Sequence, residues 1–327
     1  MKTKLWAGAN SIRCVLELGS RARSQTLTVD GRSMRGYPKV FVVGCGRSGT
    51  TWLLKLLGRH PRIQATNESH AYNDIVNVLT SRSAQRLPML IALARVLHRY
   101  DTVSRTKPWV GLHWYVTRPE MRAILRRRLD EGGERNVIAD QLVEDVFDQF
   151  MRRANATHGD VFVEKTPGHI YWAERILGTF PEARVVEMVR DGRDVAVSMS
   201  SFAKGASWPP TERQRQFEIW RDAIRAGQRL HDEPRFADRV FRVFYEDLLT
   251  EPVATTAAIL EFVGLPTDPV TIELMVTSTS AENTPIRGEG HTVNRAEAGR
   301  WRELLTTDDL EEFEKIAGPE ASLCGYL

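Results

Sequence analysis

Short hydrophobic runs alternate with longer segments of helical periodicity over most of the chain. Four runs rich in Val and Phe have the length and composition of buried strands, at residues 39–43, 161–163, 184–189 and 239–244. Helical patterns follow the strands or the turns after them, at residues 52–57, 170–177, 194–202, 253–263 and 308–316. Because parallel strands need long crossover connections, this alternation predicts a parallel sheet with helices on both faces.

One helix-rich span, residues 74–157, interrupts the alternation of strands and helices. We interpret it as a helical insertion that covers the ends of the strands, where a pocket for a substrate would be built. The predicted fold class is therefore α/β. We expect a three-layer α/β/α arrangement with a central, mostly parallel sheet, in a single domain over residues 37–327.

Composition narrows the class of protein. With 327 residues, of which 42% are hydrophobic, the chain can build a sizeable core, which excludes a fully disordered protein. Its 45 Lys and Arg residues nearly balance 42 Asp and Glu residues, so bulk nucleic acid is excluded as the main partner. Residues 1–36 hold seven basic and two acidic residues, and we expect a solvated, poorly ordered arm there.

The cysteines and the apolar segments bear on where the protein works. The longest apolar patch, near residues 89–96, includes Arg95 and is far shorter than the ~20 residues of a membrane span, so no membrane span is expected. Three cysteines without a C-x-x-C pair indicate a reducing compartment, and the expected location is cytoplasmic. No His, Asp or Glu cluster has metal-ligand spacing, so no metal is expected.

A glycine-rich loop, Gly44-Cys45-Gly46-Arg47-Ser48-Gly49-Thr50-Thr51, lies between the first predicted strand and the first predicted helix. In that position, successive backbone N–H groups and the helix N-terminus favour an anion, so the loop predicts phosphate binding and a P-loop-like fold. It departs from a Walker A loop because Thr50 replaces the lysine that would follow the last glycine. This departure weakens the case for a nucleotide triphosphatase.

A second anion-binding group is predicted at the end of another strand. Arg190 follows residues 184–189, and Ser198 lies eight residues later on the next helix. A guanidinium and a hydroxyl together suit a terminal phosphate, and both groups fall at the carboxyl ends of the strands, where such sheets bind ligands. The alternative is that Arg190 only pairs with Asp191 or Asp194 on the surface.

The motifs resemble those of the sulfotransferases that use 3′-phosphoadenosine 5′-phosphosulfate (PAPS). Arg47-Ser48-Gly49-Thr50-Thr51-Trp52-Leu53 is similar to the family's 5′-phosphosulfate loop, and residues 180–198 resemble its 3′-phosphate segment. Tyr245-Glu246-Asp247-Leu248 resembles a further family block, and the stretch from Val293-Asn294 to Gly299-Arg300-Trp301 resembles the donor-binding segment near the C-terminus. These matches run from about residue 39 to residue 301 in family order.

The resemblance implies PAPS as co-substrate, adenosine 3′,5′-bisphosphate (PAP) as product and no metal. The donor-binding residues that it implies are Arg47, Ser48, Gly49, Thr50, Thr51, Trp52, Arg190, Ser198, Tyr245 and Arg300, with Trp52 stacking on adenine. Sulfuryl transfer is an in-line displacement, so cations are expected near the leaving oxygen. Arg47 is one. Lys165 is the second candidate cation, because its position resembles that of a catalytic lysine in the tyrosylprotein sulfotransferases. The alternative is that Lys165 only pairs with Glu164.

The acceptor hydroxyl needs a base within hydrogen-bond reach. Glu68 follows the glycine-rich loop and its helix, after His60-Pro61, and this placement resembles that of the catalytic glutamate of the tyrosylprotein enzymes, so Glu68 is our candidate. His113 competes with it, because cytosolic sulfotransferases use a histidine and imidazole titrates near neutral pH. His70 and His169 are more distant choices.

The acceptor itself is not defined by the motifs. We expect a small-molecule, carbohydrate, lipid or peptide acceptor with a hydroxyl, no nucleic-acid partner, and leave a homodimer open. Two other functions remain as alternatives: a P-loop kinase of a nucleoside or sugar, and a non-catalytic nucleotide-binding module. The kinase predicts Mg²⁺ dependence and the Walker lysine that Thr50 replaces.

Overall fold

The protein is described by a computed structural model that covers residues 36–202, 208–279 and 297–327. It divides into two compact units. The first contains Glu68–His158 and the described residues up to Tyr37, and the second contains Pro38–Asn67 and Gly159–Leu327. Residues 1–35 of the expected basic arm lie outside the described residues, as do Val293 and Asn294 of the donor-binding segment.

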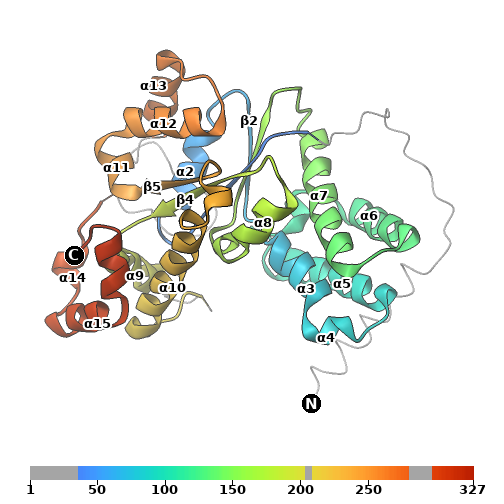
Figure 1. The fold of residues 1–327 in the computed structure, drawn as a ribbon, viewed down its shortest axis with the longest axis horizontal. Coiled ribbons are helices and arrows are strands. Elements are labelled where there is room, and N and C mark those ends of the chain that lie inside the picture. Colours follow the sequence, from blue (N-terminus) through green and yellow to red (C-terminus); the bar gives the residue numbers. More distant parts are fainter. Residues whose placement is uncertain (1–35, 203–207, 280–296) are drawn as a thin grey trace. The chain divides into compact units, whose positions relative to one another are not determined.

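The second unit is built on a five-stranded sheet (Figure 1). Its strands are β1 (Lys39–Gly44), β2 (Ile63–Asn67), β3 (Val161–Lys165), β4 (Arg184–Val189) and β5 (Val240–Phe244). They lie in the order β2-β3-β1-β4-β5, and every neighbouring pair is parallel. The parallel α/β sheet predicted from the sequence is therefore confirmed.

Helices cover both faces of this sheet. On one face, Val40 and Val42 of β1 join a buried cluster with side chains from α2 (Thr50–Leu57), α12 (Pro252–Val263) and α13 (Pro269–Ser278). On the other face, the Phe41 ring stacks on Phe180, which follows α8 (Ala173–Thr179). His231 of α10 (Arg213–His231) also reaches this face, with Nε2 2.9 Å from a Glu187 carboxylate oxygen of β4. Successive side chains of a strand point to opposite faces, so both faces are buried.

The strand register brings the carboxyl ends of the strands to one edge. Lys165 at the end of β3 pairs with Val42 of β1 and with Asn67 of β2. Gly44, the last residue of β1, pairs with Met188 near the end of β4. The loops that follow β1, β3 and β4 therefore leave the sheet at the same edge, which is where ligands bind in sheets of this kind.

The pattern of the sequence missed one strand and misplaced some helix ends. Strand β2 reads IQATN and was not among the predicted strands, because only two of its five residues are apolar. The helix expected at 170–177 divides into a 3₁₀ segment, Pro167–Trp172, and α8. Helix α15 (Thr307–Leu323) is longer than the predicted 308–316 and contains Pro319. The remaining helices of this unit are α9 (Gly192–Phe202), α11 (Tyr245–Thr250) and α14 (Trp301–Leu304).

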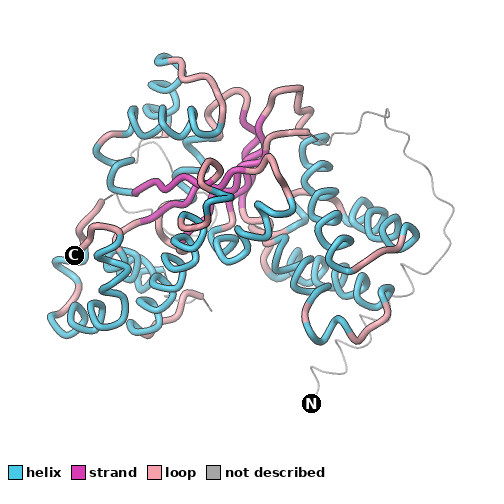
Figure 2. The backbone as a smooth tube through the Cα atoms, viewed as in Figure 1, coloured by secondary structure: helices cyan, strands magenta, loops and turns pink. Residues whose placement is uncertain are grey.

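Helices are the regular secondary structure of the described part of the first unit, with loops between them (Figure 2). After a π-helical turn, Tyr72–Val76, come α3 (Asn77–Thr80), α4 (Arg82–Gln85), α5 (Met89–Thr106), α6 (Arg118–Glu131) and α7 (Arg135–Arg153). Buried apolar side chains of α5 and α7, such as Leu97 and Phe147, form its core. In the ranges that the structure describes, no helix combines the length and the apolar character that crossing a membrane requires.

Candidate functional site

The glycine-rich loop turns the chain sharply between β1 and α2. Gly49 is the N-cap of α2 and has φ of 94°, a left-handed conformation that favours glycine. The Ser48 side chain is buried, and its Oγ has no hydrogen-bond partner among the described residues. The first N–H groups of a helix also lack partners inside the helix. The loop therefore presents an unsatisfied hydroxyl and a helix N-terminus, which together suit an anion.

Tyr245 connects this loop to the residue after β4. A Cβ atom added to Gly49 would lie 2.5 Å from Tyr245 Cδ2, so the tyrosine ring rests directly on the loop. The same ring lies under the Arg190 guanidinium, with Cζ 4.3 Å from the ring centroid. Burial raises the pKa of the Tyr245 hydroxyl, which keeps it protonated. The two predicted anion-binding groups therefore share one aromatic neighbour.

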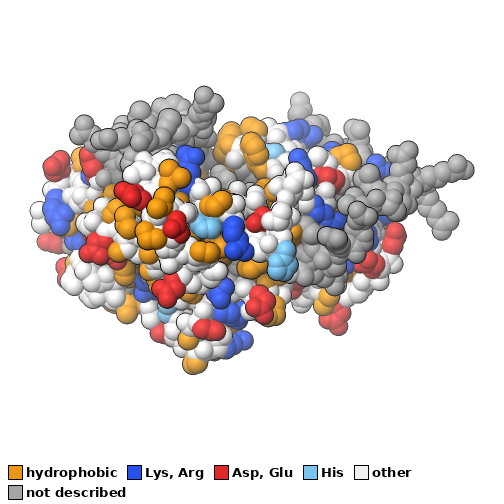
Figure 3. All heavy atoms as spheres, turned by 90° about the horizontal axis from the view of Figure 1, so that it is seen from above, with side chains coloured by type: hydrophobic (Ala, Val, Ile, Leu, Met, Phe, Trp, Pro, Cys, Tyr) orange, Lys and Arg blue, Asp and Glu red, His pale blue; other side chains and the backbone are white. Residues whose placement is uncertain are grey.

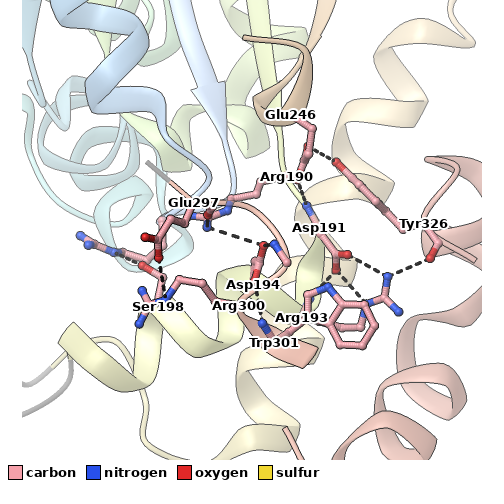
Figure 4. Close-up of polar contacts among 12 residues, drawn as sticks. Arg190, Asp191, Arg193, Asp194, Ser198, Glu246, Glu297, Arg300, Trp301 and Tyr326 are labelled. Carbon is pink, nitrogen blue, oxygen red and sulfur yellow. Dashed lines mark hydrogen bonds and ion pairs between the residues drawn. The ribbon is translucent and has the colours of Figure 1, made fainter. Parts of the chain in front are cut away.

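Arg190 is itself largely buried. Its Nη2 donates to the Glu297 carbonyl oxygen at 2.8 Å and lies 3.7 Å from Asp194 Oδ2. Its Nε is buried without a hydrogen-bond partner among the described residues. The surface pairing considered from the sequence is thus present only in part, since Asp191 engages Arg193 at 2.8 Å (Figure 4). An unsatisfied guanidinium N–H again suits an anionic ligand.

The two predicted anion-binding segments meet at a side-chain contact. Arg47 Nε, from the loop after β1, donates to Ser198 Oγ on α9 at 3.3 Å. The Arg47 guanidinium also lies over the Phe202 ring, 4.4 Å from its centroid. Arg47 and Arg190 therefore lie at the same edge of the sheet, joined by the Arg47–Ser198 bond and by Tyr245, which touches both Gly49 and Arg190.

Asp194 is a functional candidate that the sequence reasoning missed. Its carboxylate accepts from Gly299 N at 2.6 Å and from Trp301 N at 3.0 Å, so it holds the start of α14 against α9 (Figure 4). Arg300, predicted to contact the donor, has Nε 3.9 Å from Glu297 Oε2. Its role toward a ligand stays a prediction. An aspartate in the first turn of a helix is common in sequences, so the sequence carried no signal for this contact.

Lys165 ends β3 and is 1% exposed. The turn that follows it is fixed by the buried Glu164 carboxylate, which accepts a hydrogen bond from Thr166 Oγ1 and lies 3.0 Å from His169 Nδ1. His169, a distant choice for the base, is fully buried in this network. Lys165 therefore has a rigid backbone support at the edge of the sheet where the loop after β1 also lies.

Both candidate bases lie in the first unit. The Glu68 carbonyl oxygen accepts from Gly111 N at 2.7 Å, which ties the Glu68 turn to the segment of His113. The Glu68 carboxylate lies 3.2 Å from His70 Nε2 and keeps a quarter of its surface exposed. His113 Nε2 lies 3.0 Å from the Pro108 carbonyl oxygen, which can only accept. The neutral His113 ring therefore carries its hydrogen on Nε2, and its buried Nδ1 has no partner among the described residues.

The surface charge is mixed. On the face seen in Figure 3, Lys and Arg side chains of the described residues are interspersed with Asp and Glu. In the described part of the chain, no group of three or more His, Cys, Asp or Glu side chains could hold a metal ion.

Comparison with protein families decides the relationship. A model described as the sulfotransferase family matches residues 38–269, which include the loop, β3, Arg190 and Tyr245. The chain belongs to this family. The resemblance found in the motifs is confirmed, and the matched region contains residues 38–67 and 159–269 of the second unit and residues 68–158 of the first unit.

Several relatives in the sulfotransferase family are protein-tyrosine sulfotransferases. The enzyme of Drosophila melanogaster is 24% identical over 92% of this chain, and protein-tyrosine sulfotransferase 1 of Danio rerio is 24% identical over 70%. The chain spans about half the length of these two relatives, 54% of each.

Solved structures were compared as well. The sulfotransferase domain of the Synechococcus PCC 7002 olefin synthase aligns with 19% identity and a TM-score of 0.49, covering 87% of this chain and 97% of that domain. Mouse sulfotransferase SULT7A1, solved with PAP, aligns with 15% identity and the same TM-score, covering 87% of this chain and 85% of the mouse chain.

Proposed function

We propose that this chain transfers a sulfuryl group from PAPS to the hydroxyl of an acceptor. The observation that carries the proposal is the meeting of two anion-binding groups: Arg47 bonds to Ser198, and Tyr245 touches both Gly49 and Arg190. A bisphosphorylated adenosine needs two such groups, one for each end. Membership of the sulfotransferase family supports this donor over the nucleotide of a kinase or of a non-catalytic module.

The residues present fit such a donor. The buried Ser48 Oγ and Arg190 Nε each lack a partner among the described residues, and a phosphate or sulfate oxygen accepts from both. Ser48, Gly49, Thr50 and Thr51 would hold the 5′ end through side-chain and backbone donors at the N-terminus of α2. Arg190 and Ser198 would hold the 3′-phosphate. Trp52, whose ring meets Tyr245 edge-on at 5.5 Å, would lie beside the adenine, and Arg300 would add a further cation.

The chain's own residues would then assist the displacement. Arg47 and Lys165 would balance the negative charge that grows on the leaving oxygen, which is where preformed cations lower the barrier most. Glu68 would accept the proton of the acceptor hydroxyl, with His113 as the competing base. No step requires a metal held by protein side chains.

The acceptor is proposed only as a class. Any hydroxyl compound with access to the base would serve chemically, whether small molecule, carbohydrate, lipid or peptide. Because the curated relatives include protein-tyrosine sulfotransferases, the phenolic hydroxyl of tyrosine is the first acceptor to assay.

Ligand-induced thermal stabilisation tests the donor assignment. PAP added without metal should raise Tm, since a ligand at 100 times its Kd stabilises the folded state by about 2.7 kcal/mol, whereas ATP with Mg²⁺ should raise it much less. Transfer of labelled sulfate from PAPS to a panel of hydroxyl acceptors then tests catalysis. A shift with ATP·Mg²⁺ alone would support the kinase, and PAP binding without transfer to any acceptor would support the non-catalytic module.

A further inference from the structure

Tyr326 returns from the end of α15 to the residues that follow β4. Gly325 has φ of 77°, a left-handed conformation that reverses the chain after the helix. The turn is closed by Tyr326 N donating to Ala321 O at 2.9 Å and Gly325 N donating to Ser322 O at 3.0 Å, the bonding pattern of a Schellman motif. The position of Tyr326 is therefore fixed by the helix end and not by a long loop.

Both polar groups of Tyr326 bind residues next to Arg190. Its hydroxyl donates to Glu246 Oε2 at 2.8 Å, and the other Glu246 oxygen accepts from Asp191 N at 3.2 Å. Its carbonyl oxygen accepts from Arg193 Nη2 at 2.8 Å, and Arg193 also bonds both oxygens of Asp191 (Figure 4). Tyr326 thus reaches Asp191 by two routes, one through Glu246 and one through Arg193.

The ring of Tyr326 provides a third link. It packs against Trp220 at a centroid distance of 6.5 Å, and Trp220 Nε1 donates to the Arg190 carbonyl oxygen at 2.8 Å. The ring also meets Phe244, the last residue of β5, edge-on at a centroid distance of 6.2 Å. The backbone of Arg190 and of Asp191 is therefore held by groups that Tyr326 itself holds.

The hydroxyl of Tyr326 matters because Glu246 is partly buried. Burial raises the pKa of Glu246, and the hydrogen bonds from Tyr326 and from the Asp191 backbone oppose that rise. Removing the hydroxyl would leave a partly buried carboxylate short of one donor, and such a group relieves its cost by moving or by taking up a proton. Either response changes its bond to Asp191 N.

We propose that Tyr326 is a positioning residue for the 3′-phosphate of the donor, acting through Glu246 and Arg193 on the backbone that carries Arg190. The inference rests on the proposed function, since it assumes that Arg190 binds this phosphate. It follows that loss of the Tyr326 hydroxyl weakens the binding of ligands that carry a 3′-phosphate and leaves the binding of ligands that lack it unchanged. A residue that merely stabilised the fold would affect both kinds of ligand alike.

Calorimetric titration with PAP and with adenosine 5′-monophosphate, which differ by the 3′-phosphate, tests the proposal. Tyr326→Phe should raise the Kd for PAP roughly tenfold and change the Kd for the monophosphate by no more than about twofold. Glu246→Gln should have a similar effect, and the double variant should be no worse than either single one, because the two residues act as one unit. Tyr100→Phe is the matched control, since it removes a buried tyrosine hydroxyl that donates to Val116 O at 2.9 Å in the first unit.

The outcomes separate this inference from the proposed function. If wild type does not bind PAP more tightly than the monophosphate, or Arg190→Ala keeps that preference, the donor assignment fails. If wild type has the preference and Arg190→Ala loses it while Tyr326→Phe keeps it, only the role of Tyr326 is overturned. An equal loss of affinity for both ligands in Tyr326→Phe would also overturn it. Additive losses of PAP affinity in the double variant would do the same. Should Tyr326→Phe not fold, Glu246→Gln carries the same comparison.

Discussion

Arg47 Nε donates a hydrogen bond to Ser198 Oγ at 3.3 Å, although 151 residues separate the two along the chain. The contact joins the loop after β1 to the helix after β4, and Phe202 on the same helix lies under the Arg47 guanidinium. A cation fixed from both sides does not need to reorganise when charge develops nearby, which is the condition for strong transition-state stabilisation.

Substitutions of these two residues should affect different kinetic constants, because Arg47 is proposed to act on the leaving oxygen and Ser198 on the 3′-phosphate. Arg47→Ala should lower kcat by roughly 10²- to 10³-fold, the range for losing one preformed stabilising group. Ser198→Ala should raise the KM for PAPS by up to about tenfold, with a smaller change in kcat. Ser201→Ala is the control, because within the described ranges that hydroxyl bonds only Val197 O of the same helix, α9. Steady-state kinetics with labelled PAPS measure both constants, and equal effects of Ser198→Ala and Ser201→Ala would contradict the assignment.

Lys165→Met should lower kcat by about 10²-fold or more and leave the Kd for PAP within a few-fold. The reason is that the lysine ammonium interacts with the leaving oxygen more strongly in the transition state than in the ground state. Lys39→Met is a matched control, since Lys39 is also a buried lysine of the sheet but lies at the start of β1. Turnover is measured at saturating donor and acceptor. Near-normal turnover of a folded Lys165→Met protein would remove Lys165 from the mechanism.

The choice between the two bases requires a side-by-side assay. Glu68→Gln should lower kcat by roughly 10²- to 10⁴-fold, since the amide cannot accept the acceptor proton, and His113→Ala should lower it less than about tenfold. Circular dichroism must first establish that both variants fold. Loss of turnover only in His113→Ala would make the histidine the base, with its Nδ1, unprotonated in the neutral ring, as the accepting atom.

The sequence predicted the parts of the site that depend on local order. Gly49, Ser48 and Arg190 follow strands that hydrophobic patterning locates, so their placement at the carboxyl ends of β1 and β4 could be predicted, while their binding of an anion stays a prediction. Strand β2 was missed because its apolar content is low, and it forms only through pairing with β3, almost 100 residues later. Local propensity carries little information about such pairing.

Contacts between distant segments were not predictable. The bonds of Asp194 to Gly299 and of Tyr326 to Glu246 cross 105 and 80 residues of chain. Each of these residue types is common on solvated surfaces, and only the folded chain brings the partners together. The roles of Asp194 and Tyr326 therefore follow from the geometry of these contacts and not from the sequence.

Gly49→Ala should damage the loop for two separate reasons. The new methyl group would lie 2.5 Å from Tyr245 Cδ2, and the backbone at φ of 94° disfavours any residue with a Cβ. We expect a loss of about 1–3 kcal/mol in the free energy of unfolding, measured by urea titration, and a higher Kd for PAP. Gly178→Ala is the control, because a Cβ there meets no atom within 4 Å, and it should be neutral or stabilising. A normal Kd and stability in Gly49→Ala would contradict the described loop.

Cys45 should resist alkylation although it lies in the anion-binding loop. Backbone N–H groups of such loops can favour a thiolate and so lower the pKa of a cysteine. At Cys45 the opposite effect of burial is larger and raises the pKa to about 12. At pH 8 only ~10⁻⁴ of the thiol is ionised, so iodoacetamide should modify Cys45 in urea and not in the native protein. Because the native pKa lies above the unfolded one, the unfolded state loses this proton first and stability should fall as pH rises from about 9 toward 12. Mass spectrometry of the Cys45 peptide measures the modification, and rapid native labelling at pH 8 would refute the burial of this thiol.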